Sequence, residues 1–399
     1  MQRALPDWIE GFMQFTDNSE APTLFRYWTA VSCVAAALQR KTYVSLGTLT
    51  FYPNMYIILC APSGIRKGTA MGPGYELLND IGIKMSAQAT TLQALVKRLK
   101  NTTNNTIDPI TGEISMHSSL TVYSKEFTVF LGYRNQELMS HLCDWYDCEN
   151  RWRYETISRG EDEIIGVWVN IIGATTPELI QTSMPVEAIG GGLTSRMIIV
   201  YETKKGKFVP FPILTHQEEL LRESLKHDLD KIALLSGRFK FDRDYIDSWI
   251  DWRVKEEENP PQFNDPRFHG YTQRRPAHLM KLTMVMSASR GDDMILRKVD
   301  LDRGIEALCR VEKRMPMVFS GLGKSDIADL VPRVIGWLSV KKETTMAELM
   351  REFYYDADVN TMERVLKSLE TQEKLKRVVS DRGVKIRFNL KGFLEDEEE

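Results

Sequence analysis

The sequence predicts an α/β protein whose core is a parallel sheet, and two observations support this. First, short apolar runs of strand length alternate with segments of helix length over residues 56–202, as connections between parallel strands require. Second, the first of these runs, residues 56–60, is apolar at every position, which is typical of a strand buried on both faces. Further helices are expected over 216–319, and three short helices with a final hairpin end the pattern.

Composition indicates a globular protein of the cytoplasm. At 399 residues and 43% hydrophobic content, the chain can bury a large core and has the length of two or three domains. Its five cysteines are scattered and odd in number, which favours reduced thiols over a disulfide framework. No apolar signal core or window near the roughly 18 apolar residues of a membrane span is present, so no membrane partner is expected. With 52 basic and 55 acidic residues, any nucleic-acid contact must come from local patches.

Residues 1–55 precede the sheet and are expected to be mainly helical. Residues 23–39 are strongly apolar and of helix length, and Pro22 just ahead of them is a helix start signal. Residues 43–54 have the pattern of a short hairpin that leads into the first buried strand. We expect the helix to pack against the core.

The stretch YIILCAPSGIRKGT, which ends at Thr69, has the parts of a phosphate-binding loop. After the strand come small residues, among them Ser63 and Gly64, whose neighbouring N–H groups can close around phosphate oxygens, and Lys67 opens the next helix. Of the pattern G-x-x-x-x-G-K-[ST], only the lysine matches. Ala61 and Arg66 occupy the two glycine positions, and Gly68 stands where a hydroxyl is usual. Thr69 would then supply the hydroxyl. The alternative is an ordinary strand-to-helix turn with a solvated Arg-Lys pair.

Residues 119–132 are rich in strand formers and place Ser124, Lys125 and Glu126 together near the end of the run. In a nucleotide hydrolase, a second buried strand supplies one carboxylate toward the magnesium hydration shell and one that orients the attacking water. Glu126 suits the second role, whereas Lys125 occupies the place of the first acid. The alternative is a solvated Lys-Glu pair at a strand end.

Residues 151–164 have the pattern of a β-hairpin inserted before a buried strand at 167–173. Its basic and aromatic side chains suit contact with a nucleic-acid backbone and bases, and the candidates are Arg151, Arg153 and Arg159. A structural hairpin with solvated charges is the alternative. A zinc site is disfavoured, because the neighbouring His141, Cys143 and Cys148 have no partner pair elsewhere.

Two residues at the ends of later strands are candidates for contact with a terminal phosphate. Thr175 ends a strand just before Pro177 opens a helix, and its hydroxyl could sense that phosphate. The glycine-rich segment 190–202 places Arg196 at the start of a last apolar strand, where it could reach a phosphate across a subunit boundary. A surface arginine is the alternative. Downstream, Gly323-Lys324-Ser325 match the loop pattern better, but too little chain remains for a nucleotide sheet, which favours a linker.

Residues 326–391 form a separate pattern of helices at 327–340, 345–354 and 359–372, followed by a hairpin with its turn at 381–383. This is the pattern of a winged helix. Basic residues dominate the hairpin, so Lys376 and Arg377 are candidates for contact with a nucleic-acid backbone. Winged helices also serve as protein-docking modules. Residues 392–399 are expected to be a solvated acidic tail.

The order and spacing of these segments resemble the ATPase domain of phage and mobile-element primase-helicases, a family allied to the AAA+ ring helicases. The resemblance covers roughly residues 5–320 and rests on the N-terminal helices, the SGIRK loop, the SKEF strand end, the hairpin, the IIGATTPE strand and the GGLTSR segment. It implies an AAA+/RecA-like P-loop core at 56–215 and a helical lid at 216–320.

The same resemblance implies the roles of individual residues. ATP with Mg²⁺ would be bound by Ser63, Gly64, Lys67, Gly68 and Thr69, with Lys67 on the β and γ phosphates and Thr69 as the magnesium ligand. Glu126 would be the catalytic carboxylate, Thr175 the first sensor and Arg196 a trans-acting finger. Arg275 would be the second sensor, although adjacent arginines on a helix are more often solvated or paired with acids. A ring, commonly hexameric, would encircle single-stranded DNA.

Two classes of function follow as expectations. The first is an ATP-dependent, ring-forming DNA helicase or translocase that acts on single-stranded DNA in phage or mobile-element replication, with a separate primase or polymerase as a further partner. Its place would be the bacterial cytoplasm. The second is an ATP-binding DNA-recognition or helicase-loader protein with little or no hydrolysis, which Gly68 and Lys125 leave open. A nucleotide-independent scaffold is a third reading.

Overall fold

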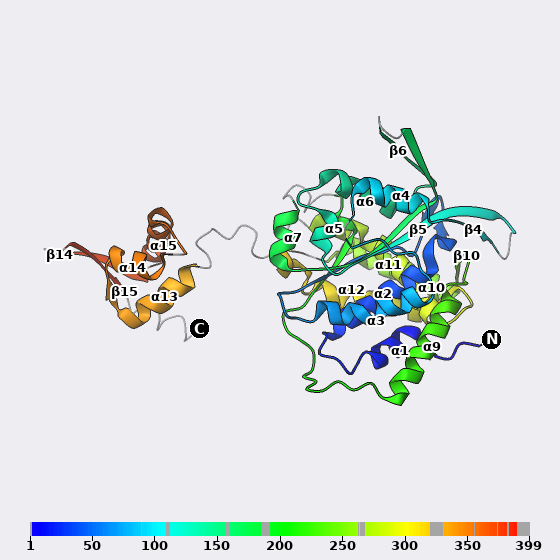
Figure 1. The fold of residues 1–399 in the computed structure, drawn as a ribbon, viewed down its shortest axis with the longest axis horizontal. Coiled ribbons are helices and arrows are strands. Elements are labelled where there is room, and N and C mark those ends of the chain that lie inside the picture. The colour runs from blue at the N-terminus through cyan, green and yellow to red at the C-terminus, as the bar shows by residue number, and fades with distance from the viewer. Residues whose placement is uncertain are drawn as a thin grey trace. The chain divides into compact units, whose positions relative to one another are not determined.

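The computed structural model describes residues 2–88, 90–108, 112–156, 160–184, 192–261, 263, 268–319, 330–354, 356–372, 374–380 and 383–388. The chain divides into two compact units, Met1–Phe319 and Ser320–Glu399, and each is described by itself. Figure 1 shows the elements of both units along the chain. The subdivisions that the sequence predicts at 55/56 and 215/216 fall inside the first unit.

The first unit is built on a five-stranded sheet with the strand order β4-β5-β8-β3-β9. Four strands run parallel, namely β5 (Ile114–Ser124), β8 (Val167–Thr175), β3 (Tyr56–Cys60) and β9 (Met197–Tyr201). The edge strand β4 (Thr103–Ile107) pairs antiparallel with β5. Every residue of β3 and β8 is buried, as the unbroken apolar runs predict. The predicted α/β class is therefore confirmed, with a mixed sheet in place of a purely parallel one.

The segment after β5 differs from the expected strand-rich run to residue 132. The strand ends at Ser124, and Phe127–Leu131 form helix α5. Phe127, Phe130 and Leu131 are buried, and their spacing of three and four residues is that of one helix face. Gly132, with a φ of 76°, then ends the helix in a conformation that favours glycine.

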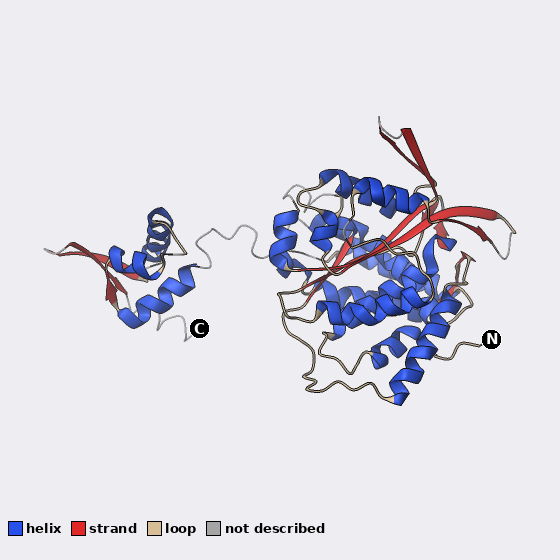
Figure 2. Cartoon of the chain, in the orientation of Figure 1, coloured by secondary structure: helices blue, strands red, loops and turns tan. Residues whose placement is uncertain are grey.

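Helices lie on both faces of this sheet (Figure 2). One face carries α2 (Thr23–Leu38) and α3 (Lys67–Asp80): Asn170 of β8 donates to Ser32 Oγ at 3.2 Å, and the Tyr123 hydroxyl donates to the carbonyl of Met71. The other face carries α5 and α6 (Gln136–Asp147), because the Tyr56 hydroxyl donates to Leu142 O at 2.7 Å. The two helices α2 and α3 begin at the positions where the site described below is built.

The predicted hairpin before β8 is present, with β6 (Arg151–Thr156) paired antiparallel with β7 (Gly160–Ile165). A second hairpin, β1 (Thr42–Leu46) with β2 (Leu49–Phe51), leads into β3, and β10 (Gly237–Arg238) joins β1 in parallel. The remaining short elements are α1 (Trp8–Phe15), α4 (Leu92–Lys100), α7 (Pro177–Ser183), η1 (Gln39–Lys41) and η2 (Thr194–Arg196).

The helices expected after β9 are α9 (His216–Ile232), α10 (Arg243–Glu258), α11 (His269–Arg290) and α12 (Lys298–Glu312). Between them β11 (Lys240–Phe241) pairs with β12 (Ile295–Leu296), and η4 (Met315–Phe319) follows α12. Among the helices that the structure describes, α11 included, none combines the length and apolar character needed to cross a membrane.

The second unit contains α13 (Leu330–Lys341), α14 (Met346–Glu352) and α15 (Val359–Thr371), in the order that the sequence predicts. A small sheet with the order β13 (Glu343–Thr344), β15 (Gly383–Phe388), β14 (Leu375–Ser380) packs on them around a core that includes Val334, Leu349, Leu366 and Ile386. Residues 381–382 of the predicted turn, Gly323-Lys324-Ser325 and the tail 392–399 lie outside the described residues.

Candidate functional site at the carboxyl edge of the sheet

The topology of the sheet singles out the carboxyl ends of β3 and β8. These strands are neighbours, and Cys60 at the end of one pairs with Thr175 at the end of the other. The chain leaves them in opposite directions: β3 leads through α3 and α4 toward β5, beyond β8, whereas β8 leads through α7 to β9, beyond β3. In open α/β sheets, ligands bind in the crevice outside such a pair of strand ends.

The loop after β3 presents an uncapped helix start to this crevice. Gly64 and Arg66 adopt left-handed backbone conformations with φ of 83° and 55°, and α3 begins directly afterwards at Lys67. No side chain caps α3, and its first turn carries no acidic residue. The N–H groups of that turn therefore remain open to an anion, which the partial positive charge of a helix N-terminus favours.

Lys67 folds back over the loop. Its Nζ donates to the carbonyl of Ala61 at 2.6 Å and to that of Pro62 at 3.0 Å. Both acceptors are uncharged, so these contacts do not neutralise the ammonium group. Burial lowers the pKa of Lys67, while the charges of Glu126 and Glu178 act in the opposite direction. The ammonium group therefore lies within the electrostatic influence of two carboxylates.

The two carboxylates come from the ends of neighbouring strands. Glu126 is exposed, follows β5 and precedes α5, as the sequence predicts for a strand-end acid. Glu178 is exposed in the first turn of α7, directly after β8. Sequence reasoning missed Glu178, although the same strand-end argument that selected Glu126 and Thr175 applies to the Thr-Thr-Pro-Glu segment that contains it.

Thr175 lies against the loop, since its carbonyl accepts a hydrogen bond from the N–H of Ala61 at 3.3 Å. Its side chain is buried, with its hydroxyl 3.4 Å from the carbonyl of Thr176. A further hydroxyl stands out at the end of β5: Ser124 Oγ is buried and has no hydrogen-bond partner among the described residues. The structure thus brings Lys67, Thr175 and Ser124 to the same edge of the sheet.

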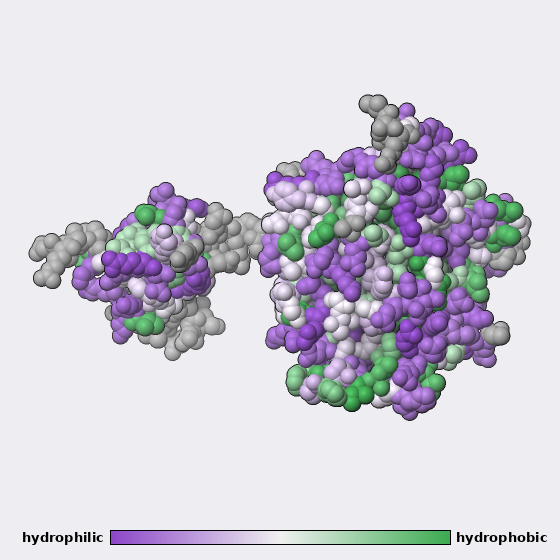
Figure 3. All heavy atoms as spheres, in the orientation of Figure 1, coloured by the Kyte–Doolittle hydropathy of each residue, from purple (hydrophilic) through white to green (hydrophobic). Residues whose placement is uncertain are grey.

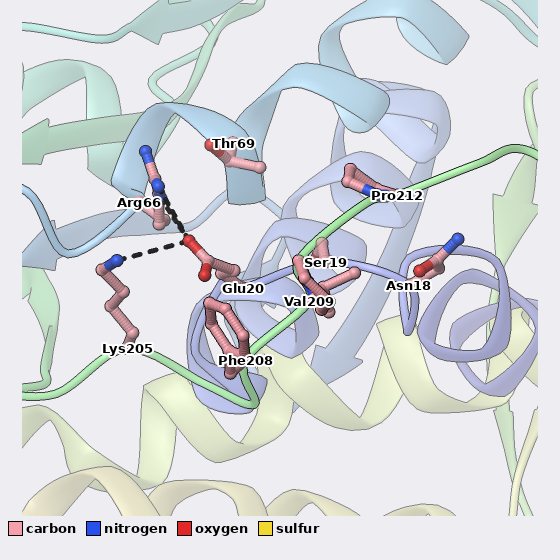
Figure 4. A pocket seen from close by; sticks show the side chains of 10 residues that line it. Asn18, Ser19, Glu20, Arg66, Thr69, Lys205, Phe208, Val209 and Pro212 are labelled. Carbon is pink, nitrogen blue, oxygen red and sulfur yellow. Dashed lines mark hydrogen bonds and ion pairs between the residues drawn. The ribbon is translucent and has the colours of Figure 1, made fainter.

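A cavity of about 650 Å³ opens beside the loop (Figure 4). The residues that line it come from three segments and are Asn18, Ser19, Glu20, Arg66, Thr69, Lys205, Phe208, Val209, Pro210 and Pro212. Glu20 Oε2 accepts hydrogen bonds from Arg66 Nε at 2.9 Å and from Lys205 Nζ at 3.3 Å. These bonds, that from Arg66 first, hold the pKa of the Glu20 carboxyl below its usual value. Thr69, the predicted magnesium ligand, also lines this cavity, opposite residues of the segment that follows β9.

Arg275 does not join the group at the edge. Its guanidinium is buried and donates to Glu312 at 2.7 Å and to Glu256 at 2.5 Å. Its remaining nitrogen donates to the second Glu312 oxygen at 3.0 Å. All three nitrogens are engaged by carboxylates, so this arrangement argues against the predicted contact between Arg275 and a cofactor.

Arg196 lies at the opposite edge of the sheet. It directly precedes Met197, which pairs with Tyr56 at the start of β3, whereas the loop follows the other end of that strand. Its side chain is buried and bonded to Asp147 at 2.5 Å and to the carbonyl of Gly192 at 2.8 Å. The surface-arginine alternative is therefore wrong, and Arg196 does not contact the loop of its own chain.

The residues predicted to contact nucleic acid differ in whether their side chains are already paired or buried. Arg153 is exposed but donates to Glu163 at 3.1 Å, and Arg151 lies 3.9 Å from the same carboxylate. Trp152, which lies between them, is buried against Trp145, so its ring is not free to stack on bases. Arg159 lies outside the described residues.

In the second unit, Lys376 is exposed on β14. Arg377 is half-buried and bonded to Glu363 at 2.7 Å and to Glu370 at 2.8 Å. Of the two basic residues predicted there, Lys376 is the one whose charge faces solvent. No cluster of three or more His, Cys, Asp or Glu that could hold a metal ion occurs in the part of the chain that the structure describes, and this includes His141, Cys143 and Cys148.

Comparison of the sequence with models of known protein families finds no match, and comparison with functionally curated proteins finds none either.

Proposed function

We propose that the chain binds ATP at the loop after β3 and acts as an ATP-dependent, ring-forming DNA helicase or translocase on single-stranded DNA, with an AAA+-like core. The observation that carries the proposal is the placement of Lys67 at the uncapped start of α3 after β3, with Glu126 and Glu178 after the parallel strands β5 and β8, at the edge where the topology favours a ligand. A lysine on phosphates and a carboxylate on the attacking water are the parts that phosphoryl transfer requires.

The loop fits a polyphosphate. An ideal Cβ at Gly64 or at Gly68 would meet no atom within 4 Å, so the space next to the backbone of both residues is open. Ser63 is exposed and small, and the first turn of α3 has no side-chain cap. The oxygens of a phosphate chain in this space would accept hydrogen bonds from the N–H groups of that turn. Lys67 would then donate to phosphate oxygens in place of its two carbonyl partners.

The strand ends fit a hydrated magnesium ion, which prefers oxygen ligands and supplies charge neutralisation to the phosphates. Ser124 offers a buried hydroxyl without a partner among the described residues, and Glu126 and Glu178 offer carboxylate oxygens. Ser124 is therefore proposed beside Thr69 as a source of the hydroxyl ligand. Glu126 is the proposed residue that orients the attacking water, and the Thr175 hydroxyl is the proposed sensor of the terminal phosphate.

The proposed ring and its DNA contacts draw on features away from this edge. Arg196 lies at the amino edge, so a phosphate that it contacts would belong to a neighbouring copy. In the second unit, three helices and a three-stranded sheet support a winged helix, and Lys376 supports contact with a nucleic-acid backbone. The order of events would be assembly around DNA, binding of ATP between copies, and hydrolysis.

The alternative is an ATP-binding DNA-recognition or helicase-loader protein with little hydrolysis. One observation favours it specifically: Arg196 is engaged by Asp147, so a copy in this state does not offer a finger to its neighbour. Lys125, exposed beside Glu126, also stands where a hydrolase would place a second acid. Nucleotide binding would then set assembly and no turnover would follow.

ATP hydrolysis by the wild type and by Lys67→Ala, each with and without single-stranded DNA, tests the proposal. Hydrolysis that DNA stimulates and that Lys67→Ala abolishes is the expected result. Lys313→Ala is the matched control, because Lys313 is an exposed lysine directly after α12 and should leave the rate unchanged. ATP binding without hydrolysis would favour the loader, and no binding by the wild type would refute both functions.

A further inference from the structure

The cavity beside the loop has two chemically different walls (Figure 4). Asn18, Ser19 and Glu20, from the turn between α1 and α2, form a polar wall. Phe208, Val209, Pro210 and Pro212, from the segment between β9 and α9, form an apolar wall. A cavity with one apolar side and one hydrogen-bonding side suits a ring system with polar atoms at its edge.

The apolar wall belongs to an exposed strap, residues 208–214, that forms neither helix nor strand. Its largest side chains face solvent: Phe208 is 80% exposed and Phe211 is 78% exposed. Figure 3 shows apolar atoms gathered along the lower border of the first unit, where this segment runs. Neighbouring exposed apolar side chains of this kind are typical of a binding surface.

The strap and the residues just before it, 206–207, are held across the polar wall by specific contacts. Asn18 Nδ2 donates to the carbonyl of Ile213 at 2.8 Å, and the N–H of Gly206 donates to the carbonyl of Glu20 at 2.9 Å. Lys207 pairs with Asp17 at 2.5 Å. An added Cβ at Gly206 would lie 2.7 Å from the carbonyl oxygen of Ala21, so glycine allows this close approach. The two walls of the cavity are therefore fixed relative to each other.

We propose that this cavity holds the nucleoside part of the nucleotide whose phosphates bind at the loop after β3. The inference rests on the proposed function and extends it to a second subsite. Arg66 and Thr69 line the cavity and flank Lys67 at the start of α3, so a ligand whose phosphates lie on that helix start continues directly into the cavity. The base stacks on Phe208, and its polar edge faces Asn18 and Ser19.

The charges around the cavity are compatible with such a ligand. Glu20 is the carboxylate nearest the loop in the polar wall, and both Arg66 and Lys205 donate to it. Two cations shared by one carboxylate leave the local charge positive, so the phosphates meet no uncompensated negative group on this side. The same contact joins the loop, the polar wall and Lys205 of the segment that leads to the strap.

Calorimetric titration with ATP and with inorganic tripolyphosphate tests the inference, because tripolyphosphate uses the loop but has no base. Phe208→Ala is expected to weaken ATP binding by about fivefold or more, the usual loss when a stacked aromatic is removed, and to leave tripolyphosphate binding unchanged. Phe211→Ala is the matched control: it removes an equally exposed ring of the same strap that does not line the cavity. It should leave both affinities unchanged.

Each other outcome overturns the inference. If Phe208→Ala binds ATP and tripolyphosphate like the wild type, the cavity does not hold the base, while the proposed function stands. If Phe208→Ala and Phe211→Ala weaken ATP binding equally and lower the mass of the assembly in light scattering, the strap is a contact between copies. If the wild type binds neither compound, the proposed function fails first. Both side chains are exposed, so the substitutions leave the buried core untouched.

Discussion

Replacement of Arg275 by methionine is expected to lower the free energy of unfolding of the first unit by about 3–5 kcal/mol, the usual effect of removing one member of a buried ion-pair network. The side chain of Arg275 is 4% exposed, and those of Glu256 and Glu312 are 9% and 8% exposed. Methionine keeps much of the apolar stem but leaves two buried carboxylates without a counter-charge. The Tyr271 hydroxyl would remain the one donor to Glu312 Oε1 from α11.

A second variant separates charge from packing. Adding Glu256→Gln and Glu312→Gln to Arg275→Met removes the two unpaired charges while nearly keeping the volume. This triple variant is expected to be more stable than Arg275→Met alone, because the largest part of the loss comes from the isolated carboxylates and not from a cavity.

Urea unfolding followed by tryptophan fluorescence measures these differences, and the ring of Trp252 lies 5.6 Å from the Arg275 guanidinium carbon. ATP affinity is measured on the same samples. An unchanged urea midpoint in Arg275→Met would refute the ion-pair argument. If that variant kept its stability and lost ATP affinity, Arg275 would return to the nucleotide site as the sequence first suggested.

Three further outcomes test other parts of the structure. Stability should fall as the pH drops below about 6.5, because burial lowers the pKa of His278 to about 3, so the unfolded chain takes up a proton first; urea midpoints at neutral and mildly acidic pH check this. Gly173→Ala should lower the melting temperature, since the new Cβ would lie 2.8 Å from Phe127 Cβ, whereas Gly72→Ala has open space and should not. Leu366→Ala should cost the second unit about 2–5 kcal/mol and leave the unfolding of the first unit unchanged, as hydrogen exchange of both units would report.

Elements whose apolar pattern repeats over a whole segment could be predicted from the sequence. The strand at 56–60 appears where its unbroken apolar run places it, and the two strands of the hairpin before β8 pair within the segment that the pattern assigns to them. Phe127–Leu131 could not be assigned this way. Four of the five residues are strand formers by type, and only burial on one helix face, with Phe127 against Gly173, shows that the segment is helical.

The site was predictable to the extent that it depends on strand ends. Lys67, Glu126 and Thr175 lie at or shortly after the carboxyl ends of β3, β5 and β8, so the parallel order of the strands brings them to one edge. The engagement of Arg275 and Arg196 was not predictable, because their carboxylate partners lie far along the chain: Glu312 is 37 residues from Arg275 and Asp147 is 49 residues from Arg196. Packing of α11, α12 and α6, which no local pattern encodes, decides those contacts.

The register of β9 constrains any role for Arg196 in the proposed mechanism. Met197 pairs with Tyr56 and the loop begins after Cys60, so Arg196 and the loop lie at opposite edges, roughly 20 Å apart along strands that rise about 3.3 Å per residue. For Arg196 and Lys67 to contact one nucleotide, the amino edge of one copy must face the carboxyl edge of the next. Such a head-to-tail contact closes into a ring or extends as a helix. In either case Asp147 must release Arg196, so the neighbouring nucleotide has to compete with an existing ion pair, and ATP binding becomes coupled to assembly.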